Sequence, residues 1–314
     1  MSGITRAEAF APPTMANVGV GFDVLGLALE GPGDTVVAEL RDEPGAIILD
    51  ITGDDHKLPR EAEKNTATVA INAFLEQINA QQGVAITLDK GLPLSSGLGS
   101  SAASAVAGVI AANALFGEPL PREELLPATL EGEALVSGYH ADNAGPALLG
   151  GIMLINGIEI NEIRALPVPE NLHLATVTPD VWVPTAEARA VLPDQVTLKA
   201  MIAQTGAIAQ LIDALYRSDI EAMAAAMERD IIIEPARAFL MPKLREIRAA
   251  AKQAGAMAVV ISGAGPTLCA VCDDATIAQQ VAITMHDTYA EAKIKSIAQA
   301  TRVDKQGARV LKTE

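Results

Sequence analysis

A glycine- and serine-rich segment constrains the fold of this chain more than any other feature. Residues 93–103 read PLSSGLGSSAA and lie between a predicted strand at 84–88 and a predicted helix at 101–116 that is apolar on nearly every side. A helix without a polar face has to be buried. Glycines let the backbone approach a ligand closely, and the first turn of a helix offers unpaired N–H groups at the positive end of its dipole. The sequence therefore predicts a buried helix whose N-terminus can bind phosphate.

Three interpretations of this segment compete. A serine ahead of a helix is a common N-cap, so the segment can be a turn and a cap without a ligand. Residues 97–102 also fit the G-x-G-x-x-A pattern of dinucleotide-binding folds, but the acid expected to end a second strand would be Glu118, which lies in GEPLP and cannot end a strand. A Walker loop is excluded because the chain has no G-x-x-x-x-G-K-S/T. A phosphate loop with serines in place of the lysine fits best, and the simple cap stays open.

Composition and charge exclude several partners. The chain has 314 residues, half of them hydrophobic, and a net charge of -16. This charge argues against nucleic acids, whose binding depends on Lys and Arg, and against anionic lipid surfaces. The longest apolar stretch, 101–116, is too short to span a membrane, and the first residues contain no apolar signal core. We therefore expect a cytoplasmic protein that binds neither nucleic acid nor membrane.

Two cysteines form a single CAVC sequence. Cys269 and Cys272 have the spacing of a redox or metal-binding pair. The surrounding residues predict a buried strand, however, and positions three apart on a strand point to opposite faces. We expect the two cysteines to be ordinary core residues.

Strands and helices alternate irregularly along the chain, which predicts an α+β fold. Two adjacent predicted strands, 257–262 and 267–272, can pair antiparallel. Two prolines in 165–169 suggest a linker, which divides the chain into domains 1–165 and 166–314. The other predicted strands are 22–29, 35–40, 47–51, 172–178 and 292–297, and residues 148–155 are predicted as a glycine turn that enters a strand. The other predicted helices are 65–78, 122–137, 198–216, 220–229, 242–254 and 275–289.

The glycine-serine segment resembles the nucleotide loop of the GHMP kinases. Residues 11–26, APPTMANVGVGFDVLG, resemble the first motif of that family. The third motif, a glycine turn beside the nucleotide loop, is matched in ISGAGPT by Gly263, Ala264, Gly265, Pro266 and Thr267. Segments 140–151 and 185–193 resemble the branch of the family that acts on homoserine. The five motifs occur in the family's order and cover almost the whole chain.

The resemblance implies both a fold and an activity. The fold is the two-domain GHMP kinase fold, with an N-terminal ribosomal-protein-like α/β domain that binds nucleotide and a C-terminal ferredoxin-like α+β domain. The activity is transfer of the γ-phosphate of ATP, with Mg²⁺, to the hydroxyl of L-homoserine on the route to threonine. Relatives are commonly dimers, so a homodimer is expected. A nicotinamide-dependent oxidoreductase and a non-catalytic nucleotide-binding regulator are the alternatives.

The family's pattern also assigns the nucleotide site. Asn65 matches a position near adenine, although it is equally well placed to be a helix N-cap. Mg²⁺ would be held by Ser100 or Ser101 together with Glu131, with Glu133 as the rival and a solvated helix carboxylate as the simpler role of Glu131. The residues expected to wrap the triphosphate are Pro93, Leu94, Ser95, Ser96, Gly97, Leu98, Gly99, Ser100, Ser101, Ala102 and Ala103.

The acceptor site is assigned in the same way. An α-ammonium group needs an acceptor such as Asp23, and an α-carboxylate suits an arginine such as Arg189, expected on a loop after a strand, or Arg237. Asp142 is the candidate catalytic base, because relatives that act on mevalonate have an aspartate near this position. The homoserine branch manages without a clear base, so we expect Asp142 to orient rather than to abstract a proton. The residues implied for the substrate are Asn17, Asp23, His140, Asn143, Arg189 and Arg237, with Asn143 also beside the reacting groups.

Overall fold

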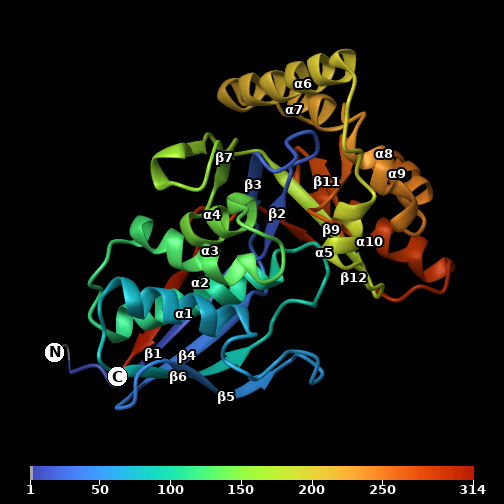
Figure 1. The fold of residues 1–314 in the computed structure, drawn as a ribbon. Helices are drawn as coiled ribbons and strands as arrows, with labels where there is room; N and C mark the ends of the chain where they lie inside the picture. The colour runs from blue at the N-terminus through green and yellow to red at the C-terminus, as the bar shows by residue number, and fades with distance from the viewer. Residues whose placement is uncertain (1–2) are drawn as a thin grey trace.

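A computed structural model describes residues 3–314, which form three β-sheets with helices packed around them (Figure 1). The first sheet has the order β13-β1-β4-β6-β5 and is antiparallel except for the β5–β6 pair. The second has the order β10-β11-β9-β12 and the third β2-β3-β7-β8, both fully antiparallel. The strands are β1 (Arg6–Ala11), β2 (Thr14–Ala16), β3 (Leu25–Ala28), β4 (Asp34–Arg41), β5 (Ala46–Thr52), β6 (Gly83–Asp89), β7 (Ile152–Ile155), β8 (Ile163–Leu166), β9 (His173–Pro179), β10 (Ala258–Ile261), β11 (Leu268–Cys272), β12 (Ser296–Thr301) and β13 (Arg309–Thr313).

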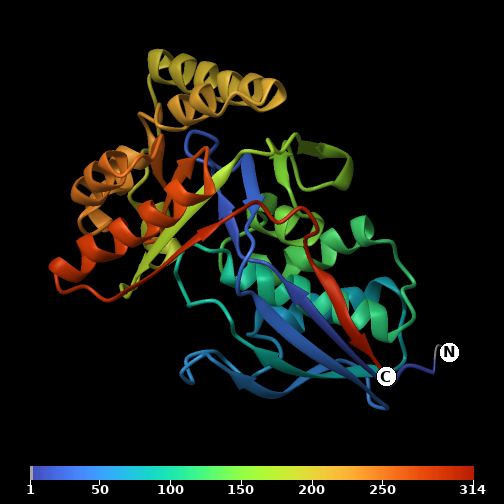
Figure 2. The same cartoon turned by 180° about the vertical axis from the view of Figure 1, so that it is seen from behind.

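Helices cover one face of the first sheet and both faces of the second (Figures 1 and 2). The long helices are α1 (Thr66–Gln77), α2 (Ser100–Leu115), α3 (Leu126–Ala134), α4 (Ala141–Leu149), α6 (Leu198–Arg217), α7 (Ile220–Met227), α9 (Leu244–Gln253) and α10 (Ala275–Glu291). The short ones are α5 (Thr185–Ala190), α8 (Ile233–Arg237), η1 (Arg122–Leu125), η2 (Ile160–Glu162) and η3 (Ala238–Leu240). None of the helices in residues 3–314 is both long and apolar enough to cross a bilayer.

Helix α2 lies at the centre of the first core, as its composition predicts. Every residue of the helix except Ser101 is buried. Alanines and small apolar residues let α1 and α3 approach it closely, while the alternating buried residues of β1 and β4 cover its other side. The glycine-serine loop, residues 93–99, therefore leads into a helix that packing holds on all sides.

The second sheet separates two further cores. Alternate residues of β11 point to opposite faces, so Cys269 packs with α6 and α7 while Cys272 packs with α9 and α10. Both are buried free thiols, and burial raises the pKa of each to about 12. The prediction that the CAVC sequence is an ordinary buried strand is confirmed.

The sequence-based boundaries differ from the structure where turns intervene. The predicted strand 22–29 is limited to β3, because residues 17–24 form a compact turn in which Asn17, Val18 and Asp23 have positive φ. The predicted strand 292–297 begins late, because α10 continues to Glu291 and Lys293 adopts a left-handed conformation before β12 starts at Ser296. Helices α4 and α5 were not predicted.

The last strand returns to the first sheet. β13 pairs antiparallel with β1, and the two lie side by side at the edge of the sheet (Figure 2). The boundary between residues 165 and 166 stays a proposal, and β13, which lies beyond it, pairs with a strand of the N-terminal part.

Candidate active site

The glycine-serine loop positions the first turn of α2 without a side-chain cap. The N-cap residue is Gly99, whose φ of 62° is in the left-handed region, and no side-chain hydrogen bond caps this helix in the described structure. The serine cap considered as an alternative is therefore not formed. The first-turn N–H groups are left available for a ligand.

Two glycines allow the three motifs to meet at this loop. A Cβ at Gly97, where φ is 80°, would overlap the carbonyl oxygen of Ser262, and a Cβ at Gly99 would overlap the Thr14 hydroxyl. Ser262 Oγ donates to the Gly97 carbonyl at 2.6 Å, and the Thr14 N–H donates to the Leu98 carbonyl at 3.0 Å. Only residues without a side chain permit this close approach of backbone to backbone.

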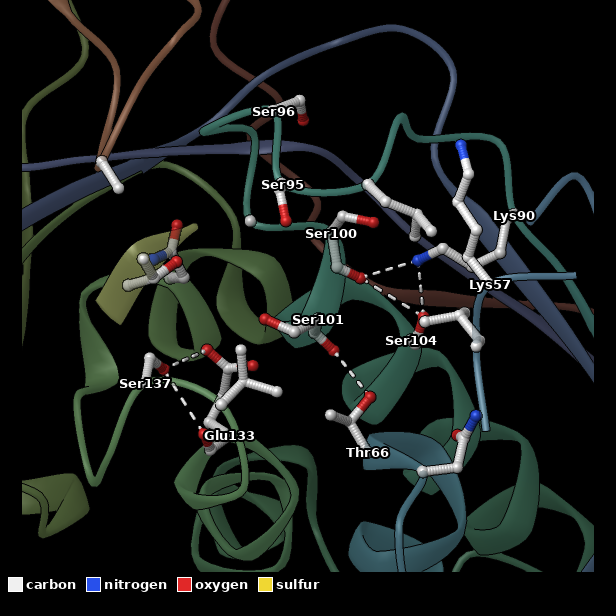
Figure 3. A pocket seen from close by; sticks show the side chains of 18 of the residues that line it. Lys57, Thr66, Lys90, Ser95, Ser96, Ser100, Ser101, Ser104, Glu133 and Ser137 are labelled. Carbon is white, nitrogen blue, oxygen red and sulfur yellow. Dashed lines mark hydrogen bonds between the residues drawn. The ribbon is translucent and has the colours of Figure 1, made fainter. Parts of the chain in front are cut away.

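The loop and the N-terminus of α2 line a cavity of about 240 Å³ (Figure 3). Ser96 and Ser100 are buried, and their hydroxyl oxygens have no hydrogen-bond partner in residues 3–314. Buried polar atoms are normally satisfied, so two orphaned hydroxyls beside free amides point to an anionic ligand. The predicted nucleotide residues that line the cavity are Asn65, Leu94, Ser95, Ser96, Gly97, Gly99, Ser100 and Ser101.

Four predicted nucleotide residues do not line this cavity. Leu98, Ala102 and Ala103 are buried in the hydrophobic cores, and Pro93 lines the neighbouring cavity instead. Their backbone still belongs to the loop and the first turn, so their role is limited to the main chain.

Asn65 is the N-cap of α1 and also lines the cavity. Its Oδ1 accepts a hydrogen bond from the Ala67 N–H at 3.0 Å, which is the N-cap geometry of α1. Its Nδ2 donates to the Pro59 carbonyl, and the residue lines the cavity. The cap fixes the side chain at the cavity wall.

The structure corrects the assignment of the carboxylate expected to hold Mg²⁺. Glu131 is exposed, accepts a hydrogen bond from the Tyr139 hydroxyl at 2.9 Å, and lies in a separate groove beside α1. Glu133 is only 2% exposed and lines the cavity together with Ser100 and Ser101 (Figure 3). The rival carboxylate is therefore the one that reaches the site.

Helical geometry explains this correction. Leu126, Leu130 and Glu133 are spaced four and three residues apart, so they share the buried face of α3, while Glu131 points to solvent. This spacing is visible in the sequence and could have shown that Glu133, and not Glu131, lies on the buried face. Burial raises the pKa of Glu133, against the opposing effects of Ser101, Ser137 and Lys90. A nearby cation would favour its charged form.

The donor set fits a magnesium ion that is shared with phosphates. Serine and carboxylate oxygens are hard ligands, and Mg²⁺ is usually bound by one or two carboxylates together with substrate phosphates. No group of three His, Cys, Asp or Glu side chains in residues 3–314 could hold a metal alone. Ser100, Ser101 and Glu133 are suited to a cation that arrives with a nucleotide.

A cluster of charged residues lies beside the cavity, and we call it the acceptor cluster. Arg189 donates two hydrogen bonds of 3.0 Å to the two carboxylate oxygens of Asp23. His140 Nδ1 lies 3.7 Å from Asp23 Oδ2. The guanidinium groups of Arg189 and Arg237 lie 5.4 and 5.2 Å from the centroid of the Phe22 ring. The structure thus brings these predicted substrate residues together, although Arg189 lies in helix α5 and not in a loop.

The third glycine motif connects the acceptor cluster to the cavity. The carbonyl of Gly263 accepts hydrogen bonds of 3.0 Å from Asn17 Nδ2 and from Arg237 Nη1. Arg237 also donates to the Ala188 carbonyl at 2.8 Å, next to Arg189. Burial and the neighbouring Arg189 charge lower the pKa of Arg237 to about 10. Gly263 itself lines the cavity, so one residue contacts both sites.

Asn143 and Asp142 occupy different environments. Asn143 lines the cavity, and its Oδ1 accepts a hydrogen bond of 2.7 Å from Thr14 Oγ1 beside Gly99. Asp142 is buried and is not among the residues that line the cavity. Burial, together with the charges of Asp23 and Glu133, raises the pKa of Asp142 to about 7. Its environment suits an orienting residue.

Replacing Asp142 with Asn is expected to change stability more than catalysis. In the folded protein the pKa of Asp142 is about 7, above its ordinary value of 3.8. Between these two pH values the folded state holds a proton that the unfolded state has lost, so the wild type loses stability as the pH rises from 3.8 to about 7. The Asn variant does not titrate, so its melting temperature should exceed that of the wild type at pH 8 and match it near pH 4. Its kcat should stay within about threefold. A fall in kcat of about 100-fold or more would instead identify Asp142 as a general base.

The dinucleotide interpretation does not agree with the structure. Glu118 lies in a turn after α2, with a φ of 56°, and not at the end of a strand. The strand ahead of the loop, β6, pairs antiparallel with β4, whereas a dinucleotide-binding fold needs a parallel core.

Comparisons with known proteins agree over nearly the full length. Residues 65–151 match the family model of the "GHMP kinases N terminal domain", and residues 211–291 match the family model of "GHMP kinases C terminal". A homoserine kinase of Chloroherpeton thalassium is 38% identical, covering 98% of this chain and 99% of the relative. A homoserine kinase of Xylella fastidiosa is 40% identical, covering 98% of this chain and 94% of the relative.

Solved structures show the same fold. The crystal structure of homoserine kinase from Cytophaga hutchinsonii has a TM-score of 0.94 and 41% identity, and the match covers 99% of both chains. A mevalonate kinase of L. major has a TM-score of 0.73 at 17% identity, covering 97% of this chain and 99% of the other. The second match supports the fold alone.

Proposed function

Because this chain belongs to the GHMP kinases, we propose that it transfers the γ-phosphate of ATP to the hydroxyl of L-homoserine, giving O-phospho-L-homoserine. The observation that carries the proposal is the position of Gly263. This residue lines the phosphate-binding cavity and, through its carbonyl, holds Asn17 and Arg237 of the acceptor cluster. A nucleotide and an amino acid can therefore be held side by side.

The triphosphate belongs at the N-terminus of α2. The first-turn amides and the unpartnered hydroxyls of Ser96 and Ser100 supply hydrogen-bond donors to phosphate oxygens. Ser100 or Ser101 and Glu133 would hold Mg²⁺, which neutralises negative charge on the transferring phosphoryl group. These residues replace the lysine of a Walker loop.

The amino acid belongs at the acceptor cluster. Asp23 is the acceptor for the α-ammonium group, and Arg189 and Arg237 are the partners for the α-carboxylate. Asp23 and Arg189 pair with each other in the structure, so each keeps the other in place for the zwitterion. His140 and Asn143 begin the helix between the two sites, where they can orient the substrate hydroxyl.

Positioning and charge stabilisation supply most of the catalysis in phosphoryl transfer. Among residues 3–314, no aspartate lines the cavity, and Asp142 is buried outside it. We therefore propose direct attack of the substrate hydroxyl, oriented by Asn143, which lines the cavity near the start of α4.

A substrate panel tests the proposal. ADP release with Mg²⁺ and ATP would be measured on homoserine, mevalonate, galactose and shikimate. We expect turnover with homoserine alone. Turnover with any of the other three but not with homoserine would refute the substrate assignment, and binding of NADH without ATP would refute the kinase assignment.

Trp182 should report nucleotide binding. It is the only tryptophan of the chain, it is 56% exposed, and it lines both the 240 Å³ cavity and the cavity next to it. A bound nucleotide should cover part of the indole, so its fluorescence is expected to shift or quench as Mg²⁺-ADP is added. Trp182→Phe should remove this signal. Unchanged emission at a concentration of Mg²⁺-ADP that inhibits turnover would contradict the assigned cavity.

We further propose a cytoplasmic homodimer without nucleic-acid or membrane partners. The net charge of -16 supports the absence of nucleic-acid binding. Size-exclusion chromatography with light scattering would measure the oligomeric state.

A further inference from the structure

A buried ion pair lies directly beneath the glycine-serine loop. Lys90 follows β6, Asp34 begins β4, and their side chains are 1% and 0% exposed. Burying two charges costs free energy of desolvation that their mutual attraction often fails to offset, so such a pair is weak evidence for a role in stability. Its position calls for another explanation.

The contacts of Lys90 use all of its hydrogen-bond donors. Its ammonium group donates to Asp34. It also donates to the Ser100 carbonyl at 2.9 Å and to Ser104 Oγ at 2.8 Å (Figure 3). An ammonium group has three donors, so none is left for a ligand. Lys90 lines the cavity, yet it is bound to the protein.

Asp34 extends these contacts to the other end of the loop. Its Oδ1 accepts a hydrogen bond from the Leu92 N–H at 3.2 Å, and its Oδ2 accepts one from Ser104 Oγ at 2.6 Å. Leu92 immediately precedes the loop and Ser100 immediately follows it. One buried ion pair therefore fixes both ends of the loop.

The bond to Ser100 also acts on the neighbouring amide. In a trans peptide the C=O and N–H groups point in opposite directions, so the N–H of Ser101 points away from Lys90 toward the helix N-terminus. A cation bound to the carbonyl polarises the peptide group and makes its N–H a better donor. That N–H is one of the groups available to phosphate.

We propose that Lys90 and Asp34 are positioning residues for phosphoryl transfer, which hold the loop and the first turn of α2 so that their amides and hydroxyls aim at the triphosphate. This inference rests on the proposed use of ATP. A Walker lysine contacts phosphate directly. Lys90 instead binds the Ser100 carbonyl in the first turn of α2 and acts on the phosphate only through that peptide group.

The test is a double variant, Lys90→Met with Asp34→Asn. Replacing a buried ion pair by uncharged residues of similar size is often tolerated, whereas removing one partner leaves an unpaired charge. We expect the double variant to fold, its Kd for Mg²⁺-ADP to rise at least about tenfold, and its Kd for adenosine and KM for homoserine to stay within about twofold. A residue with a purely structural role would not change phosphate affinity selectively.

A milder variant and a control make the result decisive. Ser104→Ala removes one hydroxyl from the network and should weaken Mg²⁺-ADP binding in the same direction, by about threefold, even if the double variant fails to fold. Ile247→Val removes one methylene group from the core beneath α9. It should lower the melting temperature without changing nucleotide affinity.

Two results would overturn the inference. One is wild-type affinity for Mg²⁺-ADP in a folded double variant, or in Ser104→Ala when the double variant fails to fold. The other is an equal loss of affinity for adenosine, which would assign Lys90 to the base. Failure of the proposed function is separate, because it would appear as absent ATP turnover in the wild type.

Discussion

Glu133→Gln is expected to lower kcat/KM for ATP by about 100-fold or more, while Glu131→Gln leaves it within about twofold. Glutamine has the shape of glutamate but lacks the charge that binds Mg²⁺. Glu133 is buried at the cavity beside Ser100 and Ser101, whereas Glu131 is exposed on the opposite face of α3. Charge stabilisation by a metal is worth several kcal/mol, and each 1.36 kcal/mol corresponds to a factor of about ten in rate.

Initial rates measured over a Mg²⁺ titration would test this expectation. The Glu133→Gln variant should need more Mg²⁺ for half-maximal rate and should keep its melting temperature, because burial already disfavours the charge of this carboxyl. Equal losses of kcat/KM in the two variants, or wild-type activity of Glu133→Gln, would show that Glu133 is not the carboxylate that binds the metal.

Arg189→Met should raise the KM for homoserine by roughly 100-fold and leave the KM for ATP unchanged. The variant lacks the guanidinium group, which can donate two hydrogen bonds to the substrate carboxylate. It also leaves Asp23 without its two hydrogen bonds of 3.0 Å. Truncating one member of a hydrogen-bonded charge pair costs about 2–5 kcal/mol in binding. Arg189→Lys keeps the charge without the planar fork, so an intermediate loss of about tenfold is expected.

Arg217→Met is the matched control for this variant. Arg217 pairs with Asp213 on α6, both side chains are more than half exposed, and neither lines the cavity. Steady-state kinetics with each substrate varied in turn would separate the two KM values. An ATP KM that rises as much as the homoserine KM would place Arg189 at the nucleotide.

The sequence predicted the elements whose signals are local. The all-apolar composition of 101–116 indicated a buried helix, and α2 is buried throughout except at Ser101. The two neighbouring predicted strands at 257–262 and 267–272 indicated an antiparallel pair, and β10 and β11 form it. The loop was recognisable because its glycines must have no side chain where three backbone segments meet.

Elements with weak local signals were missed. Helix α4 contains Gly145 and Pro146, both poor helix formers, and is held by packing against β3, β7 and α2. Strand β13 is largely exposed without a buried alternation, so only its pairing with β1 defines it. Contacts with other elements, and not the local sequence, therefore define both α4 and β13.

The site was predictable as far as the motifs reach. They predicted that Asp23, His140, Arg189 and Arg237 lie together, as the structure places them. The choice between the two glutamates needed the direction of the helix face. The Lys90–Asp34 pair joins residues 56 positions apart, and no local pattern marks it. Buried electrostatic contacts of this kind become visible only when the fold is known.

A crystal structure with Mg²⁺ and a non-hydrolysable ATP analogue is the most direct test of the nucleotide site. We predict the phosphates within hydrogen-bond distance of the amides at Gly99–Ser101, with the metal bound to Glu133. A triphosphate bound elsewhere, with the hydroxyls of Ser96 and Ser100 turned into the protein, would contradict the assignment of this loop.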